Sequence, residues 1–219
     1  MNAGYFSGMY EPPPRPAPVR ELSPLGDGVF GDLAPRHRPL VSRGLIVLCG
    51  LVFAAQQLDG NLIERFAVGS DQILRGGEWW RLITGAFIHA NLIHFAMNAW
   101  FGWSVGMIVE RFVGPARMFI VSLAAMLASS GLVAFMGQNS VGFSGVLYGW
   151  LGAWLAFHFT PRFPGLRLSG AGFRSFMTTL GLNVVISLAP GISFLGHLGG
   201  FVGGFAVAFL LGLGRPRAS

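Results

Sequence analysis

The chain has 219 residues, of which 53% are hydrophobic and 11% charged, and its mean hydropathy is +0.58. Soluble domains carry about 25% charged residues, so this composition excludes an ordinary soluble protein and indicates one embedded in a lipid bilayer. The net charge of +6 comes from arginines scattered between apolar segments, whereas a nucleic-acid-binding surface would cluster them on one face, so we expect no nucleic acid partner.

The first 42 residues contain eight prolines among glycines and arginines, a composition that buries too little apolar surface to fold. We therefore predict a flexible cytoplasmic tail at 1–42, a membrane domain at 43–214 and a short cytoplasmic C-terminus at 215–219. The start of the chain has neither the apolar run nor the small-residue cleavage site of a secretory signal peptide, so we expect none.

From Arg43 onwards the chain consists of apolar stretches close to the length of about 20 residues with which a helix spans a bilayer. An all-α membrane protein with six spanning helices is predicted. The single cysteine, Cys49, lies in the first helix, so helix packing and not a disulfide must hold the bundle together. The predicted helices are 43–58, 86–108, 115–136, 143–160, 173–189 and 193–213.

The segment between the first and second predicted helices, 59–85, contains Trp79, Trp80 and Arg81, which are typical of a membrane interface. It also holds three of the 15 arginines, whereas the other twelve fall in the tail or after the second, fourth and sixth helices. Cytoplasmic segments of membrane proteins carry the excess of basic residues. Both termini are therefore predicted to be cytoplasmic, with the first loop on the outer side.

Few polar groups lie inside the predicted helices. Placing such groups in hydrocarbon costs free energy, so those that are present are candidates for function. His94 is expected about two turns into the second helix, Ser144 at the start of the fourth and His197 about one turn into the sixth. The predicted topology puts all three in the outer half of the membrane, at nearly the same depth.

Ser144 allows two interpretations. As a helix cap, its hydroxyl would accept a hydrogen bond from an unpaired N–H group at the start of the fourth helix. As a nucleophile, it needs a nearby base. Small residues such as Gly145 and Gly200 recur at four-residue spacing on their helices and would let the two helices approach until His197 reaches Ser144. The cap interpretation does not predict a histidine at the matching depth, so the nucleophile is favoured.

Attack by Ser144 would create an oxyanion. His94 and Asn98 share a helix face and can donate hydrogen bonds to it, although Asn98 could also bridge two membrane helices. No Asp or Glu is expected at that depth, so packing must orient the base, for which Tyr148 on the face of Ser144 is the candidate. We predict a serine–histidine dyad and not a triad, with His89 turned away at the start of its helix.

This set of residues resembles the rhomboid family of intramembrane serine proteases over roughly residues 43–213. The resemblance implies a rhomboid-like bundle of six transmembrane helices, a water-filled cavity open to the outside, and a membrane-associated first loop lying half in the outer leaflet. The matching motifs are Trp80-Arg81, His89-x4-His94-x3-Asn98, Glu110, Gly142-x-Ser144-Gly145 with Tyr148, and Gly196-His197-x2-Gly200-x3-Gly204.

The resemblance also implies an activity, the hydrolysis of peptide bonds in transmembrane substrates near their outer ends, with no metal and no cofactor. It implies a bacterial inner (plasma) membrane as the location. The implied roles are Ser144 as nucleophile, His197 as base, His94 and Asn98 as oxyanion partners, and Tyr148, His89, Gly142, Gly145 and Gly200 as supporting residues.

Two other functions remain open. One is a catalytically inactive rhomboid-like protein that binds membrane clients, although such relatives usually lack the serine or the histidine. The other is a small transporter or channel, against which the nearly apolar inner half of the bundle argues.

We also predict roles for three residues outside the dyad. Glu110 is interpreted as structural, and Arg81 as an anchor of the first loop. Phe143 stands where the family often has a smaller residue, and its ring is expected to narrow the substrate pocket beside the nucleophile.

Overall fold

The computed structural model describes residues 37–213, so most of the predicted N-terminal tail and the short C-terminus lie outside the described residues. The described part consists of helices joined by turns and irregular segments, and its one extended pairing is an isolated bridge between Val68 and Ser140. Its elements in chain order are α1 (Leu40–Leu58), α2 (Leu62–Phe66), α3 (Ser70–Leu74), α4 (Arg81–Thr84), η1 (Gly85–Phe87), α5 (Leu92–Val113), α6 (Pro115–Phe135), α7 (Ser144–Phe159), η2 (Pro164–Leu166), α8 (Gly170–Ser187) and α9 (Phe194–Gly212).

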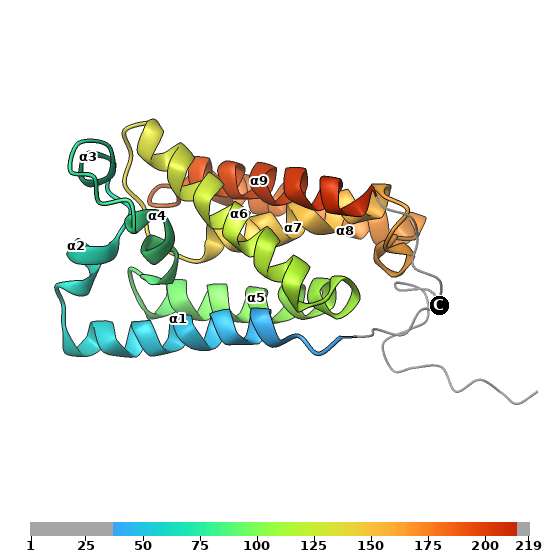
Figure 1. Ribbon diagram of the computed structural model, residues 1–219, viewed down its shortest axis with the longest axis horizontal. Coiled ribbons are helices and arrows are strands. Elements are labelled where there is room, and N and C mark those ends of the chain that lie inside the picture. The colour runs from blue at the N-terminus through green and yellow to red at the C-terminus, as the bar shows by residue number, and fades with distance from the viewer. Residues whose placement is uncertain (1–36, 214–219) are drawn as a thin grey trace, which may run out of the picture.

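The long helices of the described part, α1, α5, α6, α7, α8 and α9, each overlap one predicted span and follow the predicted order (Figure 1). Four of them, α1, α5, α6 and α9, have the length and apolar composition to cross a membrane. The other two, α7 and α8, have 16 and 18 residues. The all-helical class of the prediction is confirmed.

The second predicted span, 86–108, is wrong at both ends, because α5 covers Leu92–Val113. Gly85–Phe87 form a separate 3-10 turn. The side chain of Asn91 then caps α5 by accepting a hydrogen bond from the backbone N of His94 at 2.8 Å. His94 consequently lies in the first turn of α5. Apolar residues continue through the turn, so hydropathy alone did not locate this boundary.

The central helix of the bundle is α7, which is buried at almost every position from Gly145 to Phe157. It packs against α6 and α9 (Figure 1). A side-chain carbon built at Gly200 of α9 would collide with the carbonyl of Gly145, and one at Gly204 would collide with the carbonyl of Gly149. Backbone therefore lies against backbone between α7 and α9, as small residues at four-residue spacing allow.

The start of α1 is capped by a side chain from another helix. Glu110, near the end of α5, is fully buried and accepts hydrogen bonds from Val41 N at 2.8 Å and from Ser42 N and Oγ at 2.7 and 2.6 Å. These N–H groups lie in the first turn of α1, where the helix itself offers them no partner. The contacts agree with the structural role expected of Glu110.

Arg81 holds the first loop together from inside. Its side chain is buried, and its guanidinium group donates to Glu78 Oε2 at 2.6 Å and to the carbonyls of Glu64 and Ala67 at 2.8 and 2.9 Å. Two parts of the loop, the end of α2 and the segment before α4, thus converge on one side chain. The expected anchoring role of Arg81 matches these contacts.

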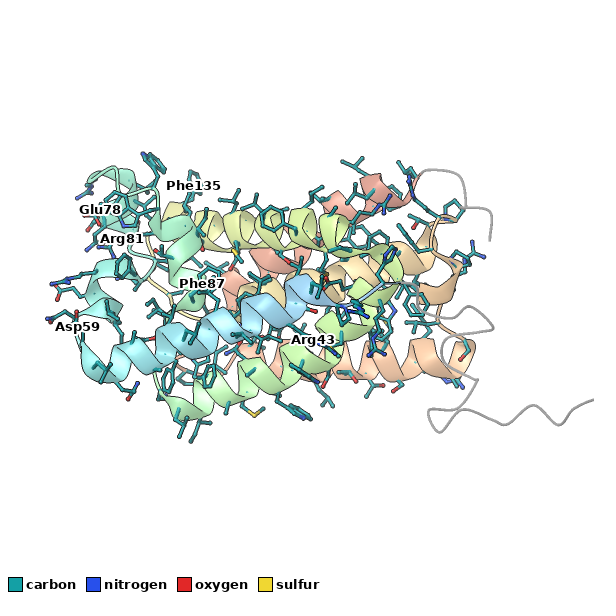
Figure 2. The ribbon with its side chains drawn as sticks, turned by 60° about the horizontal axis from the view of Figure 1, so that its bottom comes forward. Arg43, Asp59, Glu78, Arg81, Phe87 and Phe135 are labelled. Carbon is teal, nitrogen blue, oxygen red and sulfur yellow. The ribbon has the colours of Figure 1, made fainter. Side chains whose placement is uncertain are left out.

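The first loop also reaches the segment that leads into α7. Figure 2 shows Arg81 at the end of the molecule where α1 finishes, near Asp59. Next to Ala67, Val68 exchanges two backbone hydrogen bonds with Ser140, from Val68 N to Ser140 O at 2.9 Å and from Ser140 N to Val68 O at 3.0 Å. The loop therefore supports the backbone four residues before Ser144.

Candidate active site

The segment before α7 takes its shape from Gly142. The φ angle of Gly142 is +116°, a conformation that L-residues rarely adopt, and its N–H donates to the carbonyl of Gly85 at 3.0 Å. A side-chain carbon at position 142 would lie 2.6 Å from Nε2 of His94. Glycine is required here by the backbone and by the available space, and it lets His94 lie against the segment that leads into Ser144.

Ser144 is the first residue of α7, with Phe143 in the N-cap position and no side-chain capping bond. Its Oγ lies 2.8 Å from Nε2 of His197, which belongs to the first turn of α9. This distance is possible because α7 and α9 touch through Gly145 and Gly200. The structure pairs Ser144 with a histidine and does not use it as a helix cap.

The imidazole ring of His197 is buried and has a neighbour on its face and another at its second nitrogen. Tyr148, one turn after Ser144, stacks on the ring with centroids 4.1 Å apart and planes inclined by 11°. The Oγ of Ser187, at the end of α8, lies 2.6 Å from Nδ1. Ser187 was missed by the sequence analysis. The available signal was its four-residue spacing from Asn183, which puts two polar residues on one face of the fifth predicted helix.

His94 and Asn98 line the same cavity as Ser144 and His197. Asn98 is buried, and its Nδ2 donates to the carbonyl of His94 at 2.7 Å. Both residues belong to the first two turns of α5, so one short piece of helix brings an imidazole and an amide to the cavity. Each of these groups has N–H donors of the kind that stabilise an oxyanion.

His89 lies outside α5 and packs behind His94. Gln56 of α1 holds its backbone by two hydrogen bonds, from Gln56 Nε2 to His89 O at 2.9 Å and from His89 N to Gln56 Oε1 at 3.0 Å. Its ring is edge-on to that of His94, with centroids 5.2 Å apart. The contacts suit a supporting role, in which His89 and Gln56 fix the turn that precedes α5. Gln56 was not expected from the sequence.

A cavity of about 870 Å³ contains the Ser144–His197 pair. Polar groups enter it from α5, α7, α8, α9 and the segment before α7, and apolar side chains surround them. Among the apolar lining residues are Ile93, Met97, Phe101, Leu147, Ile186 and Ile192.

Phe143 is not among the residues that line this cavity. Its side chain is buried in the core, edge-on to Trp150 with ring centroids 5.4 Å apart. The expectation that Phe143 narrows the substrate pocket is therefore wrong. A residue next to a nucleophile in sequence can point the opposite way, because the direction of a side chain in a turn depends on the backbone and not on the spacing.

The apolar helices of this bundle indicate an integral membrane protein, and its cavity holds a serine–histidine pair. The chain belongs to the rhomboid family, because the family model described as Rhomboid domain matches residues 76–214, more than half of its length.

Three curated proteins illustrate the family relationship. The chain is 30% identical to Rhomboid protease GluP of Bacillus subtilis (strain 168) in an alignment that covers 83% of this chain and 36% of that protein. It is 32% identical to RHOMBOID-like protein 6, mitochondrial, of Arabidopsis thaliana over 67% of this chain and 48% of that protein. It is 30% identical to Rhomboid-like protease 2 of Toxoplasma gondii over 67% of this chain and 52% of that protein. The matches thus span about a third to a half of the length of these relatives.

Proposed function

We propose that this protein is an intramembrane serine endopeptidase that hydrolyses peptide bonds of transmembrane substrates near their outer ends. The observation that carries the proposal is the 2.8 Å contact between Ser144 Oγ and His197 Nε2 inside a cavity of about 870 Å³. Membership of a family with members named rhomboid proteases supports the same activity.

In the proposed reaction, Ser144 Oγ attacks the carbonyl carbon of the scissile bond while His197 Nε2 takes the hydroxyl proton. The negative charge that develops on the carbonyl oxygen is stabilised by N–H donors of His94 and Asn98 and by the N-terminus of α7. The carbon–nitrogen bond then breaks, and His197 gives its proton to the leaving amine. An acyl ester on Ser144 remains.

The second half of the reaction releases the acyl group. Water enters the cavity and attacks the ester carbonyl, while His197 Nε2 takes a proton from the water. The bond between the carbonyl carbon and Ser144 Oγ breaks, and the proton returns to Oγ. The products are a new carboxyl group and the free serine. Each step uses groups of this chain and water alone.

We also propose an arrangement of the helices in the membrane. All six long helices would cross it, including the short α7, which is surrounded by the others, and α8. The arginines that flank the start of α1, the α5–α6 turn and the α7–α8 connection belong to the end of the bundle opposite the first loop (Figure 1). By the positive-inside rule, that end would be cytoplasmic and the active site would face outwards. We propose a bacterial inner membrane as the location, in line with the similarity to Rhomboid protease GluP of Bacillus subtilis.

The test is cleavage of a model single-span substrate by purified protein in liposomes. Ser144→Ala and His197→Ala should each reduce the cleavage rate by at least about 1,000-fold, because each removes a group that acts only in the transition state. Ser104→Ala, which changes an exposed serine on α5, is the matched control and should cleave normally.

Cleavage retained by either dyad variant would overturn the assignment. A wild-type protein that binds the substrate without cutting it would instead indicate an inactive, client-binding member of the family.

A further inference from the structure

Nδ1 of His197, the ring nitrogen that does not face Ser144, has a partner outside the proposed dyad. Ser187 Oγ lies 2.6 Å from His197 Nδ1, and Tyr148 Oη lies 2.7 Å from the same Ser187 Oγ. Ser187 is 1% exposed, so these contacts are shielded from water.

The carbonyl of Asn183 determines which groups donate and which accept hydrogen bonds in this network. Ser187 Oγ and Tyr148 Oη each lie 2.7 Å from that oxygen, which can only accept a hydrogen bond. When the Ser187 hydroxyl donates to the Asn183 carbonyl, the lone pairs of Ser187 Oγ face His197 Nδ1. His197 then carries its proton on Nδ1 and donates it to Ser187. Nε2 is left without a proton and faces the hydroxyl of Ser144 at 2.8 Å.

The place of Ser187 in the fold sets it apart from an ordinary helix serine. In the fully described helix α8, only Phe176 and Ser187 are buried. A serine that bonds back to the carbonyl four residues earlier is common in membrane helices. Ser187 does so and in addition contacts the imidazole nitrogen of His197 on α9, which requires α8 to lie against α9 at this position.

We propose that Ser187 is a positioning residue for the base. It holds the imidazole ring of His197 in the tautomer and orientation that let Nε2 take the proton of Ser144, and it accepts a stronger hydrogen bond from Nδ1 when the ring becomes positively charged in the transition state. This inference rests on the proposed peptidase function. Through the hydroxyl group of Ser187, α8 would help to orient the base. Tyr148 would stack on the ring of His197 and also contact the Ser187 hydroxyl.

The experiment compares Ser187→Ala with Ser175→Ala, the same change at an exposed position of α8, in the liposome cleavage assay. Ser187→Ala should lower kcat by about 10- to 100-fold, the effect of losing a hydrogen bond to a group that becomes charged. KM should stay within about twofold, since the interaction is made with the base and not with the substrate. Ser175→Ala should leave both values unchanged.

A second pair separates the hydroxyl group from the shape of the side chain. Thr and Val have nearly the same shape, so Ser187→Thr should retain a kcat at least about tenfold above that of Ser187→Val. A fluorophosphonate probe should likewise label Ser144 faster in Ser187→Thr than in Ser187→Val, because labelling needs the base but not a transmembrane substrate.

Equal kcat and labelling rates for Ser187→Thr and Ser187→Val would overturn the positioning role, as would a Ser187→Ala variant that raises KM alone. Ser144→Ala runs in parallel. If Ser144→Ala still cleaves, the peptidase proposal itself fails. If Ser144→Ala is inactive while Ser187→Ala has the wild-type kcat, only the role of Ser187 fails.

Discussion

The backbone at Gly142 has a conformation that glycine adopts without strain and other residues do not, and the ring of His94 occupies the space where a side chain would begin. We predict that Gly142→Ala lowers the free energy of unfolding by about 1–3 kcal/mol, because both the positive φ and the contact with His94 must relax. Cleavage should fall by at least about tenfold, since His94 and Ser144 move apart. Thermal unfolding and substrate cleavage in liposomes measure the two effects.

Gly131→Ala provides the control for Gly142. Gly131 lies within α6, and a side-chain carbon there meets nothing within 4 Å. Alanine in a helix interior is favoured over glycine by about 0.5–1 kcal/mol, so this variant should be as stable as the wild type or slightly more. If Gly142→Ala behaves like Gly131→Ala, the conformation at position 142 does not matter for the site.

At the scale of single residues, the sequence predicted the groups whose chemistry is rare inside a membrane. Ser144, His197 and His94 were found because polar groups in apolar helices are few, and the structure brings the three to one cavity. Ser187 was missed because a hydroxyl on a membrane helix usually bonds to its own backbone, so its four-residue spacing from Asn183 did not by itself indicate a partner on another helix. The expectation for Phe143 was wrong because the backbone of the turn before α7, and not the sequence spacing, sets the direction of its side chain.

The contact between α7 and α9 is the element on which the site depends. We predict that Gly200→Ala lowers the free energy of unfolding by about 1–3 kcal/mol, because the added carbon would meet the carbonyl of Gly145 and the two backbones must separate. His197 lies three residues before Gly200 on α9, so the separation should also lengthen its contact with Ser144 and reduce cleavage. Thermal unfolding and cleavage assays on one preparation test both effects.

The matched control for Gly200 is Gly181→Ala on α8, where an added carbon meets nothing within 4 Å. That variant should unfold at or slightly above the wild-type temperature and cleave normally. Equal stability and activity of Gly181→Ala and Gly200→Ala would contradict the close approach of α7 and α9.

At the scale of elements, the sequence predicted the order of the long helices from apolar runs and the α7–α9 contact from glycine spacing. The start of α5 was not predicted, because the 3-10 turn before it is as apolar as the helix. The boundary is made by the side chain of Asn91, and by Gln56 of α1, which holds the turn from outside. A contact between distant parts of the chain leaves no periodic signal in either part.

Across the whole molecule, the first loop is connected to the nucleophile through a series of contacts. The guanidinium group of Arg81 donates a hydrogen bond to the carbonyl of Ala67, and the next residue, Val68, pairs with Ser140. Ser140 lies two residues before Gly142. We predict that Arg81→Ala lowers the free energy of unfolding by about 3 kcal/mol, because it leaves buried hydrogen-bonding groups without their charged partner. Cleavage should fall by about tenfold, as the segment before Ser144 loses its support.

Arg75 provides the comparison within the same loop. Its contact with Asp71 is 3.6 Å long and both side chains are exposed, so Arg75→Ala should change the free energy of unfolding by less than about 1 kcal/mol. If both arginine variants have the same effect, the loop does not support the nucleophile segment. The sequence identified Arg81 as an anchor, but the pairing of Val68 with Ser140 joins segments about 70 residues apart and was beyond what local patterns predict.

The proposed chemistry requires Ser144 to be a nucleophile activated by His197. Labelling of the purified protein in liposomes by a fluorophosphonate probe, with the modified residue identified by mass spectrometry, tests this requirement. We expect a covalent adduct on Ser144 in the wild type, none in Ser144→Ala, and labelling slowed by at least about 100-fold in His197→Ala. An adduct on another residue, unchanged labelling in His197→Ala, or no adduct while a control serine hydrolase reacts would contradict it.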